Sequence, residues 1–339
     1  MGQTIACANQ KGGVGKTTTV VNLATYLALA GDRVLVVDLD PQGNATSGFG
    51  LGRGDADRSV YDAFIGSLTL AELVRPSGIA GLDIIPSSIG LAGAEVELAP
   101  LAQRERRLAR LIGTVSGGYD YILIDCPPSL GLLTVNALTA ADSVLIPIQC
   151  EYYALEGLTQ LIATVNLVRD HLNPALEVKG VVMTMYDART NLSAEVLAEV
   201  RRHLGETVYR TIVPRSVRLS EAPSFGQPIA LYRADSKGAQ AYEALAAEIR
   251  QRDGRPGGET WRTGNGRDHG ASVELAADDG RPAANGGPDG RDLPVAELVA
   301  AGGHPPIRPP RSGGALGDGA EPVFGVEGDG RPRSVMVES

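Results

Sequence analysis

The 339-residue sequence predicts an α/β fold: one doubly wound, mostly parallel sheet with helices on both faces. Two observations favour it. Apolar, strand-like runs alternate with segments of helical periodicity, which is the order of βαβ units. The runs are also almost continuously apolar, as in residues 34–37, and strands buried on both faces of a parallel sheet have this composition. No strand-rich segment indicates a separate antiparallel domain.

The expected elements alternate along the chain. Strands are expected at residues 4–8, 33–38, 82–86, 119–125, 143–148, 178–185 and 208–213. Helices are expected at residues 20–30, 60–65, 70–74, 101–114, 151–172, 192–204 and 236–250. Each strand followed by a helix gives the connection that a parallel sheet needs.

The composition divides the chain at about Gly254. Residues 254–339 contain 19 Gly and 10 Pro in 86 positions and carry a net charge of −4. Such a segment buries too little apolar surface to offset its ordering entropy, so we expect a folded domain at 1–253 and a disordered tail at 254–339. The tail's one helical candidate, 294–300, is too short and too weakly basic to anchor on a membrane.

The composition of the whole chain argues against several classes of protein. No run of 18 apolar residues predicts a transmembrane helix, and the N-terminus does not resemble a signal peptide. Three widely spaced cysteines without a C-x-x-C pair indicate reduced thiols in a cytoplasm rather than a zinc or iron–sulfur site. The net charge of −9 is unusual for a nucleic-acid binder, so any DNA contact must come from a local basic patch.

The most informative stretch is N-Q-K-G-G-V-G-K-T-T-T at residues 9–19, which lies between an apolar run and a helical pattern. In this context glycines let backbone N–H groups and a helix N-terminus point at phosphate oxygens. The spacing predicts that Lys16 reaches the β- and γ-phosphates and that the Thr17 hydroxyl ligates Mg²⁺. The expected phosphate-binding residues are Gly12, Gly13, Val14, Gly15, Lys16, Thr17 and Thr18.

Carboxylates end two other expected strands. Asp38 and Asp40 lie at the end of strand 33–38, and Asp125 ends strand 119–125 before a Pro-Pro pair. Open α/β sheets place their sites at the carboxyl ends of strands. An apolar strand that ends in Asp is the Walker B pattern, which predicts that Asp125 holds the water shell of Mg²⁺.

These motifs resemble the ParA/MinD superfamily of ATPases across residues 1–253. Gln10 stands where an ordinary phosphate loop has glycine, and Lys11 follows it as in that family's "deviant" loop. D-L-D-P-Q-G-N-A-T resembles the family's switch I, and D-C-P-P-S resembles its switch II. The resemblance implies that Lys11 reaches the partner's nucleotide in an ATP-dependent homodimer. It also implies that Asp40 activates the attacking water and that Asp38 supports the Mg²⁺ shell.

The segments 185–192, 213–226 and 236–242 are similar to the ParA/Soj partition branch. This implies slow hydrolysis of ATP to ADP and phosphate, a ParB-type protein partner, and segregation of chromosome or plasmid DNA at the nucleoid. It also implies adenine-side contacts from Met185, Pro214 and Arg215. The candidates for sequence-blind DNA contacts are Arg189, Arg218, Arg201 and Arg202.

Two other functions use the same loop. A MinD-like ATPase would position a protein cargo without binding DNA, but this chain lacks a terminal membrane-binding amphipathic helix and carries the arginine loops. A metabolic ligase such as a dethiobiotin-synthase-like enzyme would need convergent polar residues beyond the nucleotide site, which the sequence does not reveal. A salt-sensitive DNA complex formed only with ATP would separate the partition function from the MinD-like one, and a product other than ADP and phosphate would favour the ligase.

Overall fold

The computed structural model describes residues 2–52, 58–151 and 154–255. Eight strands form one sheet in the order β3-β4-β2-β5-β1-β6-β7-β8, and every neighbouring pair is parallel except β3 with β4. This confirms the predicted fold class. The strands are β1 (Gln3–Cys7), β2 (Val34–Asp38), β3 (Arg75–Ile79), β4 (Leu82–Ile85), β5 (Tyr121–Asp125), β6 (Ser143–Gln149), β7 (Glu177–Tyr186) and β8 (Val208–Pro214).

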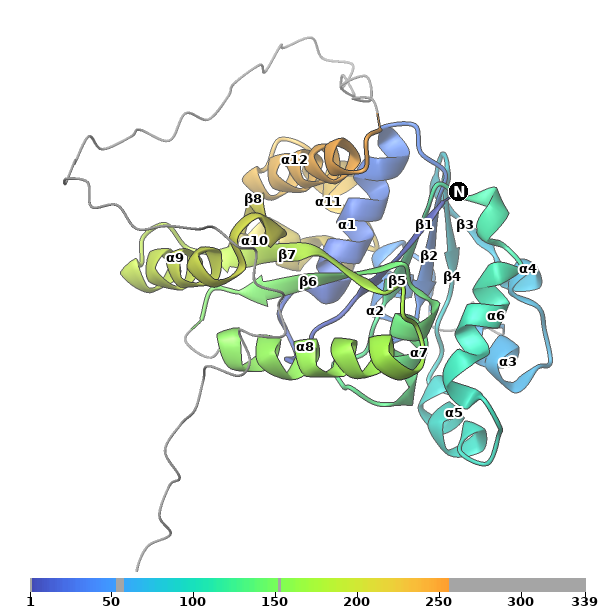
Figure 1. Cartoon of the computed structure of the whole chain (residues 1–339). Coiled ribbons are helices and arrows are strands. Elements are labelled where there is room, and N and C mark those ends of the chain that lie inside the picture. Colours follow the sequence, from blue (N-terminus) through green and yellow to red (C-terminus); the bar gives the residue numbers. More distant parts are fainter. Residues whose placement is uncertain (1, 53–57, 152–153, 256–339) are drawn as a thin grey trace, which may run out of the picture. The chain divides into compact units, whose positions relative to one another are not determined.

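Helices cover both faces of the sheet. Figure 1 shows α1 and α12 on one side and α8 on the other. The first face carries α1 (Lys16–Leu29), α2 (Asn44–Gly48), α10 (Val217–Glu221), α11 (Ile229–Tyr232) and α12 (Lys237–Arg252). The second carries α3 (Val60–Ile65), α4 (Leu70–Leu73), α5 (Leu91–Leu98), α6 (Arg107–Gly113), α7 (Leu132–Ala140), α8 (Ala154–His171) and α9 (Asn191–Leu204).

The central strands have the burial that their composition predicts. All five residues of β2 and all five of β5 are buried. Side chains alternate between the two faces: Leu35 and Val37 pack into the core under α3 and α5, while Val34 and Val36 pack into the core under α1 and α12. Apolar burial on both faces therefore holds β2 and β5 in place, and their C-terminal ends open at one edge of the sheet.

Several elements differ from the sequence prediction, which also did not include the short helices α2, α10 and α11. The edge strand β3 was not expected, because R-P-S-G-I has no apolar alternation. It pairs antiparallel with β4, and the register shifts between Pro76 and Ile79. Helix α7 was also missed, because L-L-T-V-N-A-L-T-A is mostly buried and has no polar stripe. The helix expected at 101–114 is α6, which is preceded by a 3-10 turn (Arg104–Arg106), while α5 forms a separate helix before it.

The ordered contacts of the domain extend to Arg255, two residues past the predicted boundary. The Arg255 guanidinium lies 4.6 Å from the centroid of the Tyr121 ring and 3.0 Å from the Asp32 carboxylate. Residues 256–339, which make up almost all of the predicted tail, lie outside the described residues. Among the described residues, no helix combines the length and apolar character needed to span a bilayer.

Candidate nucleotide site

The glycine loop joins the end of β1 to the start of α1. Gly13 and Gly15 have φ angles of +74° and +88°, in the left-handed region that favours glycine. Lys16 is the first residue of α1 and is only 6% exposed. Its ammonium Nζ donates to the carbonyl of Lys11 at 3.2 Å, so the lysine side chain folds back across the loop. The loop therefore encloses a positive charge at a helix N-terminus, an arrangement suited to phosphate.

Side chains from distant parts of the chain hold the loop. The Asn9 amide donates to the carbonyl of Pro147 at 2.7 Å and accepts from the Lys11 N–H at 3.0 Å. The Thr184 hydroxyl, on β7, donates to the carbonyl of Val14 at 2.8 Å. The sequence analysis assigned no role to Asn9 or Thr184. Both tie the loop to the ends of β6 and β7.

Lys11 forms an ion pair within its own chain. Its Nζ lies 2.5 Å from Oε2 of Glu151, just beyond the end of β6. The two side chains are 39% and 44% exposed. This glutamate was not among the residues expected at the site.

The carboxylates that were expected together do lie together. Parallel pairing sets Asp38 opposite Asp125 at the ends of β2 and β5. Asp38 is fully buried and accepts hydrogen bonds from the backbone N–H of Asp40 and from both the N–H and the hydroxyl of Thr46. Burial raises the pKa of Asp38 to about 6, against the lowering effect of these donors.

Asp125 differs from Asp38 in that its buried carboxylate lacks hydrogen-bond donors. It is fully buried, and neither of its carboxylate oxygens has a hydrogen-bond partner of ordinary geometry. Burial first, and then the charge of Asp38, raise the pKa of Asp125 well above its usual range, while the Thr17 hydroxyl and the Lys16 ammonium act in the opposite direction. A buried carboxylate without a partner is costly, so this position fits a cation or a proton.

The oxygen atoms of the side chains at this site are ligands of the kind that Mg²⁺ prefers. Within the described ranges, no group of three or more His, Cys, Asp or Glu side chains is arranged to hold a metal ion by itself. Mg²⁺ in nucleotide sites usually keeps several waters and takes only one or two protein carboxylates besides phosphate oxygens. Thr17 and Asp125 fit that pattern. Asp38 already accepts three hydrogen bonds, so it fits a supporting position better than direct ligation.

Asp40 lies two residues beyond the end of β2 and is 6% exposed. Its carboxylate accepts from the N–H of Gln42 at 3.0 Å, and its carbonyl accepts from the N–H of Gly43 at 2.9 Å. The turn therefore fixes the carboxylate near Asp125, whose pKa it helps to raise.

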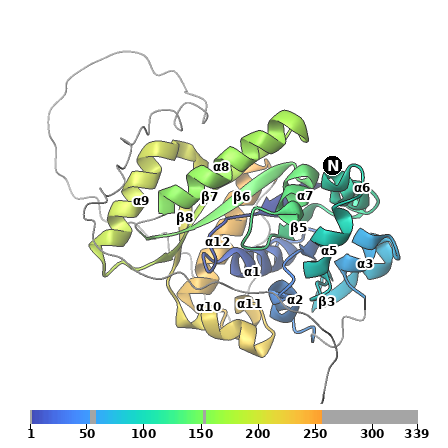
Figure 2. The ribbon, with the colours of Figure 1, turned by 90° about the horizontal axis from the view of Figure 1, so that it is seen from below.

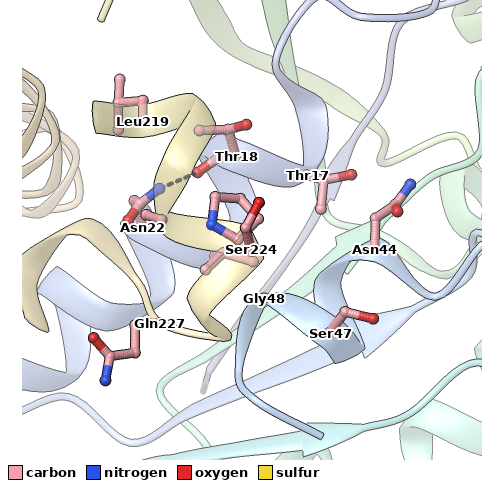
Figure 3. Close-up of a pocket in the computed structure, with 12 residues that line it drawn as sticks. Thr17, Thr18, Asn22, Asn44, Ser47, Gly48, Leu219, Ser224 and Gln227 are labelled. Carbon is pink, nitrogen blue, oxygen red and sulfur yellow. Dashed lines mark hydrogen bonds between the residues drawn. The ribbon is translucent and has the colours of Figure 1, made fainter. Parts of the chain in front are cut away.

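A cavity of about 400 Å³ opens beside the first turn of α1. Figure 3 shows that α1, α2 and the segment after α10 each contribute to its wall, with Thr17 and Asn44 on one side and Gln227 on another. Figure 2 shows α2, α10 and α11 grouped beside α1. The cavity shares Thr17 and Thr18 with the predicted phosphate site. Its other lining residues are Val21, Asn22, Asn44, Ser47, Gly48, Leu219, Ala222, Pro223, Ser224 and Gln227.

The predicted adenine-side residues lie together, but they do not line this cavity. Tyr186 is the register partner of Pro214 in the β7–β8 pair, and the Arg215 N–H donates to the Tyr186 carbonyl at 2.9 Å. Met185 precedes this contact and has a φ angle of +52°, which is uncommon for a residue with a side chain. The ends of β7 and β8 therefore form one unit next to the loop, which Thr184 contacts.

The four arginine candidates are exposed and already have polar partners. Arg189 pairs with Asp187 and Arg218 with Glu221, in each case with a shortest distance of 2.7 Å. In the last turn of α9, Arg202 pairs with Glu199, while Arg201 donates to the carbonyl of Arg210 at 3.4 Å. Arg189 lies just before the start of α9, whereas Arg201 and Arg202 lie in its last turn. The length of this helix therefore separates Arg189 from these two arginines.

All three cysteines are free and buried. Burial raises the pKa of the Cys126 thiol and that of the Cys150 thiol, the latter to about 11. Neither thiol is therefore a reactive nucleophile at neutral pH.

Comparison with known proteins identifies relatives. A family model described as "AAA domain" matches residues 2–178. The sporulation initiation inhibitor protein Soj of Bacillus subtilis is 57% identical over 249 residues, covering 74% of this chain and 98% of Soj. The chromosome partitioning protein ParA of Caulobacter vibrioides is 52% identical, covering 74% and 95%.

A solved structure named cobyrinic acid a,c-diamide synthase from Mycobacterium smegmatis, with a bound ATP analog and magnesium, superposes with a TM-score of 0.66. It is 37% identical and covers 77% of this chain and 100% of that one. The parallel sheet and its glycine loop define a phosphate-loop nucleotide-binding protein of the α/β class. The chain belongs to the Soj/ParA family of chromosome-partitioning ATPases.

Proposed function

We propose that this protein is a partition ATPase that dimerises with ATP, binds DNA without sequence preference and hydrolyses ATP to ADP and phosphate. In this proposal it segregates chromosome or plasmid DNA with a ParB-type partner, in the cytoplasm and on the nucleoid. The observation that carries the proposal is the buried, unpartnered carboxylate of Asp125, close to Lys16 and Thr17. The names of the relatives from Bacillus and Caulobacter support the partition role.

The loop residues 12–18 would bind the phosphates through backbone N–H groups and the Lys16 ammonium. Thr17 and Asp125 would hold Mg²⁺, with Asp38 supporting its water shell. Bound Mg²⁺ supplies positive charge to the β- and γ-phosphates. Asp40 would position the attacking water, and Lys11 would contact the nucleotide of the partner subunit. Because Asp40 is the one candidate for orienting water, unstimulated turnover should be slow.

We assign the adenine side to Met185, Pro214 and Arg215, at the joined ends of β7 and β8. The neighbouring cavity has apolar and neutral polar walls, which also suit part of a nucleoside. One chain segment connects the two surfaces, since Leu219 follows Arg215 by four residues and lines the cavity.

DNA binding would depend on local arginines, because the whole chain carries a charge of −9. Arg189 and Arg218 are the first candidates, and Arg201 and Arg202 extend the set along α9. Phosphate contacts of this kind release counterions, so the affinity should fall steeply with salt.

The two alternatives have weaker support. The solved structure that is 37% identical carries the name of an amide synthase, which corresponds to the ligase alternative. The partition relatives are more similar, at 57% and 52%, and the chain covers nearly all of each. A MinD-like ATPase without DNA affinity would share the nucleotide site and would differ at the arginines and by a terminal amphipathic helix.

Hydrolysis tests the enzymatic part of the proposal. Release of phosphate from ATP should be slow in the wild type and should fall at least tenfold in Lys16→Ala. Lys237→Ala is the matched control, because Lys237 is exposed at the start of α12 and is not one of the predicted phosphate-binding residues. Equal rates in wild type and Lys16→Ala, or formation of a product other than ADP and phosphate, would contradict the proposal.

A further inference from the structure

The loop lysine Lys11 is held at three points in its own chain. Its N–H donates to Asn9, its carbonyl accepts from Lys16, and its ammonium lies 2.5 Å from Glu151. The first two contacts fix the backbone of the loop. The third fixes the direction of the side chain, which extends toward the end of β6 in the same subunit.

Glu151 is itself positioned by a neighbour. Its second carboxylate oxygen accepts from the Gln149 side-chain amide at 2.5 Å, and its backbone N–H donates to the Gln149 carbonyl at 2.8 Å. Gln149 is the last residue of β6, a strand buried along most of its length. The carboxylate is therefore held next to Lys11 by contacts with the last residue of a buried strand.

The pair is accessible to solvent, which makes it weak. Ion pairs with side chains exposed by about two fifths contribute little net stability, because water and salt screen them. A γ-phosphate carries more charge than one carboxylate and also accepts charge-assisted hydrogen bonds from an ammonium group. A γ-phosphate presented by a second subunit can therefore displace Glu151 from Lys11.

We propose that Glu151 is a positioning residue that retains Lys11 in its own subunit and thereby raises the ATP concentration needed for dimerisation. The inference rests on the proposed function, in which Lys11 contacts the partner's nucleotide. Each subunit must break one Lys11–Glu151 pair before its lysine can cross the interface. ADP, which has no γ-phosphate, cannot provide the competing anion at that position, so the resting pair persists with ADP.

The test is dimerisation of full-length protein against ATP concentration, measured by light scattering, for wild type and Glu151→Gln. Glutamine keeps the size of the side chain but removes its charge and leaves one acceptor oxygen in place of two. We expect Glu151→Gln to reach half-maximal dimer at an ATP concentration two- to fivefold lower, the range that a solvent-exposed ion pair allows. Glu195→Gln, an equal charge change at an exposed position on α9, should match wild type.

The same comparison in a Lys11→Ala background separates positioning from a general effect on structure. If Glu151 acts through Lys11, then Glu151→Gln shifts nothing once the lysine is absent. An unchanged or higher ATP requirement in Glu151→Gln alone, or an equal shift with and without Lys11, would overturn the inference while leaving the partition ATPase intact. Failure of the wild type itself to dimerise with ATP would instead overturn the proposed function, and the inference with it.

Discussion

Asp38 and Asp125 are register partners at the ends of neighbouring parallel strands, and both carboxylates are fully buried. Asp38 accepts three hydrogen bonds, whereas neither oxygen of Asp125 has a hydrogen-bond partner. Burial first, and then the charge of Asp38, raise the pKa of Asp125, so this arrangement is unfavourable unless a cation or a proton neutralises it. The first two predictions follow from this pair.

Asp125→Asn should stabilise the protein in the absence of nucleotide and weaken its use of Mg²⁺. The substitution removes a buried carboxyl that lacks a partner, so the melting temperature without Mg²⁺ at pH 7.5 should rise by a few degrees. Loss of a group that holds the metal shell should lower Mg²⁺-dependent ATP affinity about 10- to 100-fold. Calorimetry and nucleotide titration check both effects. Asp235→Asn, at an exposed position, is the control, and identical behaviour of the two variants would contradict the assignment.

The buried pair also predicts how stability depends on pH. Burial raises the pKa of Asp38 from 3.8 to about 6, so between these values the folded state binds more protons than the unfolded state. The free energy of unfolding contributed by this group therefore falls as the pH rises through 6. Without Mg²⁺, the wild type should lose more stability between pH 5 and 7.5 than Asp125→Asn, in which the pair is uncoupled. An equal loss of stability with pH in the two proteins would contradict an interaction between Asp38 and Asp125.

Thr46 links the switch turn to the core. Its hydroxyl donates to Asp38 at 2.8 Å and accepts from the Ser87 N–H at 3.0 Å, and the residue is 2% exposed. Thr46→Val keeps the shape but leaves two buried polar groups short of a partner, which should cost about 1–3 kcal/mol of unfolding free energy. Urea unfolding measures the loss. Thr46→Ser retains the hydroxyl and should lose clearly less; equal losses would assign the effect to packing instead.

The Asp187 carboxylate forms an ion pair with the guanidinium of Arg189, the first candidate for DNA binding. It accepts from Arg189 at 2.9 and 2.7 Å, and these bonds hold the pKa of the Asp187 carboxyl well below its usual range. Asp187→Asn should free the arginine for phosphate and strengthen ATP-dependent DNA retention several-fold. Filter binding at fixed salt measures the gain. The gain should vanish in an Arg189→Ala background, and a gain that persists there would remove Arg189 from the DNA surface.

Much of the site could be predicted because its signals are local. The glycine spacing identifies the loop, and apolar strands that end in Asp38 and Asp125 must meet at one edge of a parallel sheet. The fold class and the family were confirmed for the same reason. The roles assigned to the individual site residues, the ParB partner and the tail remain predictions.

The remaining features depend on contacts between distant segments. Glu151 lies 140 residues from Lys11, and Thr184 lies 170 residues from Val14, so no local pattern marks either contact. Thr46 stands within the resembling switch segment, but its bond to Asp38 depends on the turn that follows β2. Strand β3 has little apolar character and owes its place to its pairing with β4. These are tertiary effects that composition and periodicity do not encode.

The most direct test of the central claim is retention of unrelated DNA sequences by the wild type and by Lys16→Ala, with ATP, with ADP and without nucleotide, across a salt series. Retention is expected only for the wild type with ATP, equal for all sequences and falling steeply with salt. Arg218→Glu should lose most of this retention. An ATP-induced dimer that retains no DNA at low salt would contradict the partition function and would favour an ATPase that positions a protein cargo.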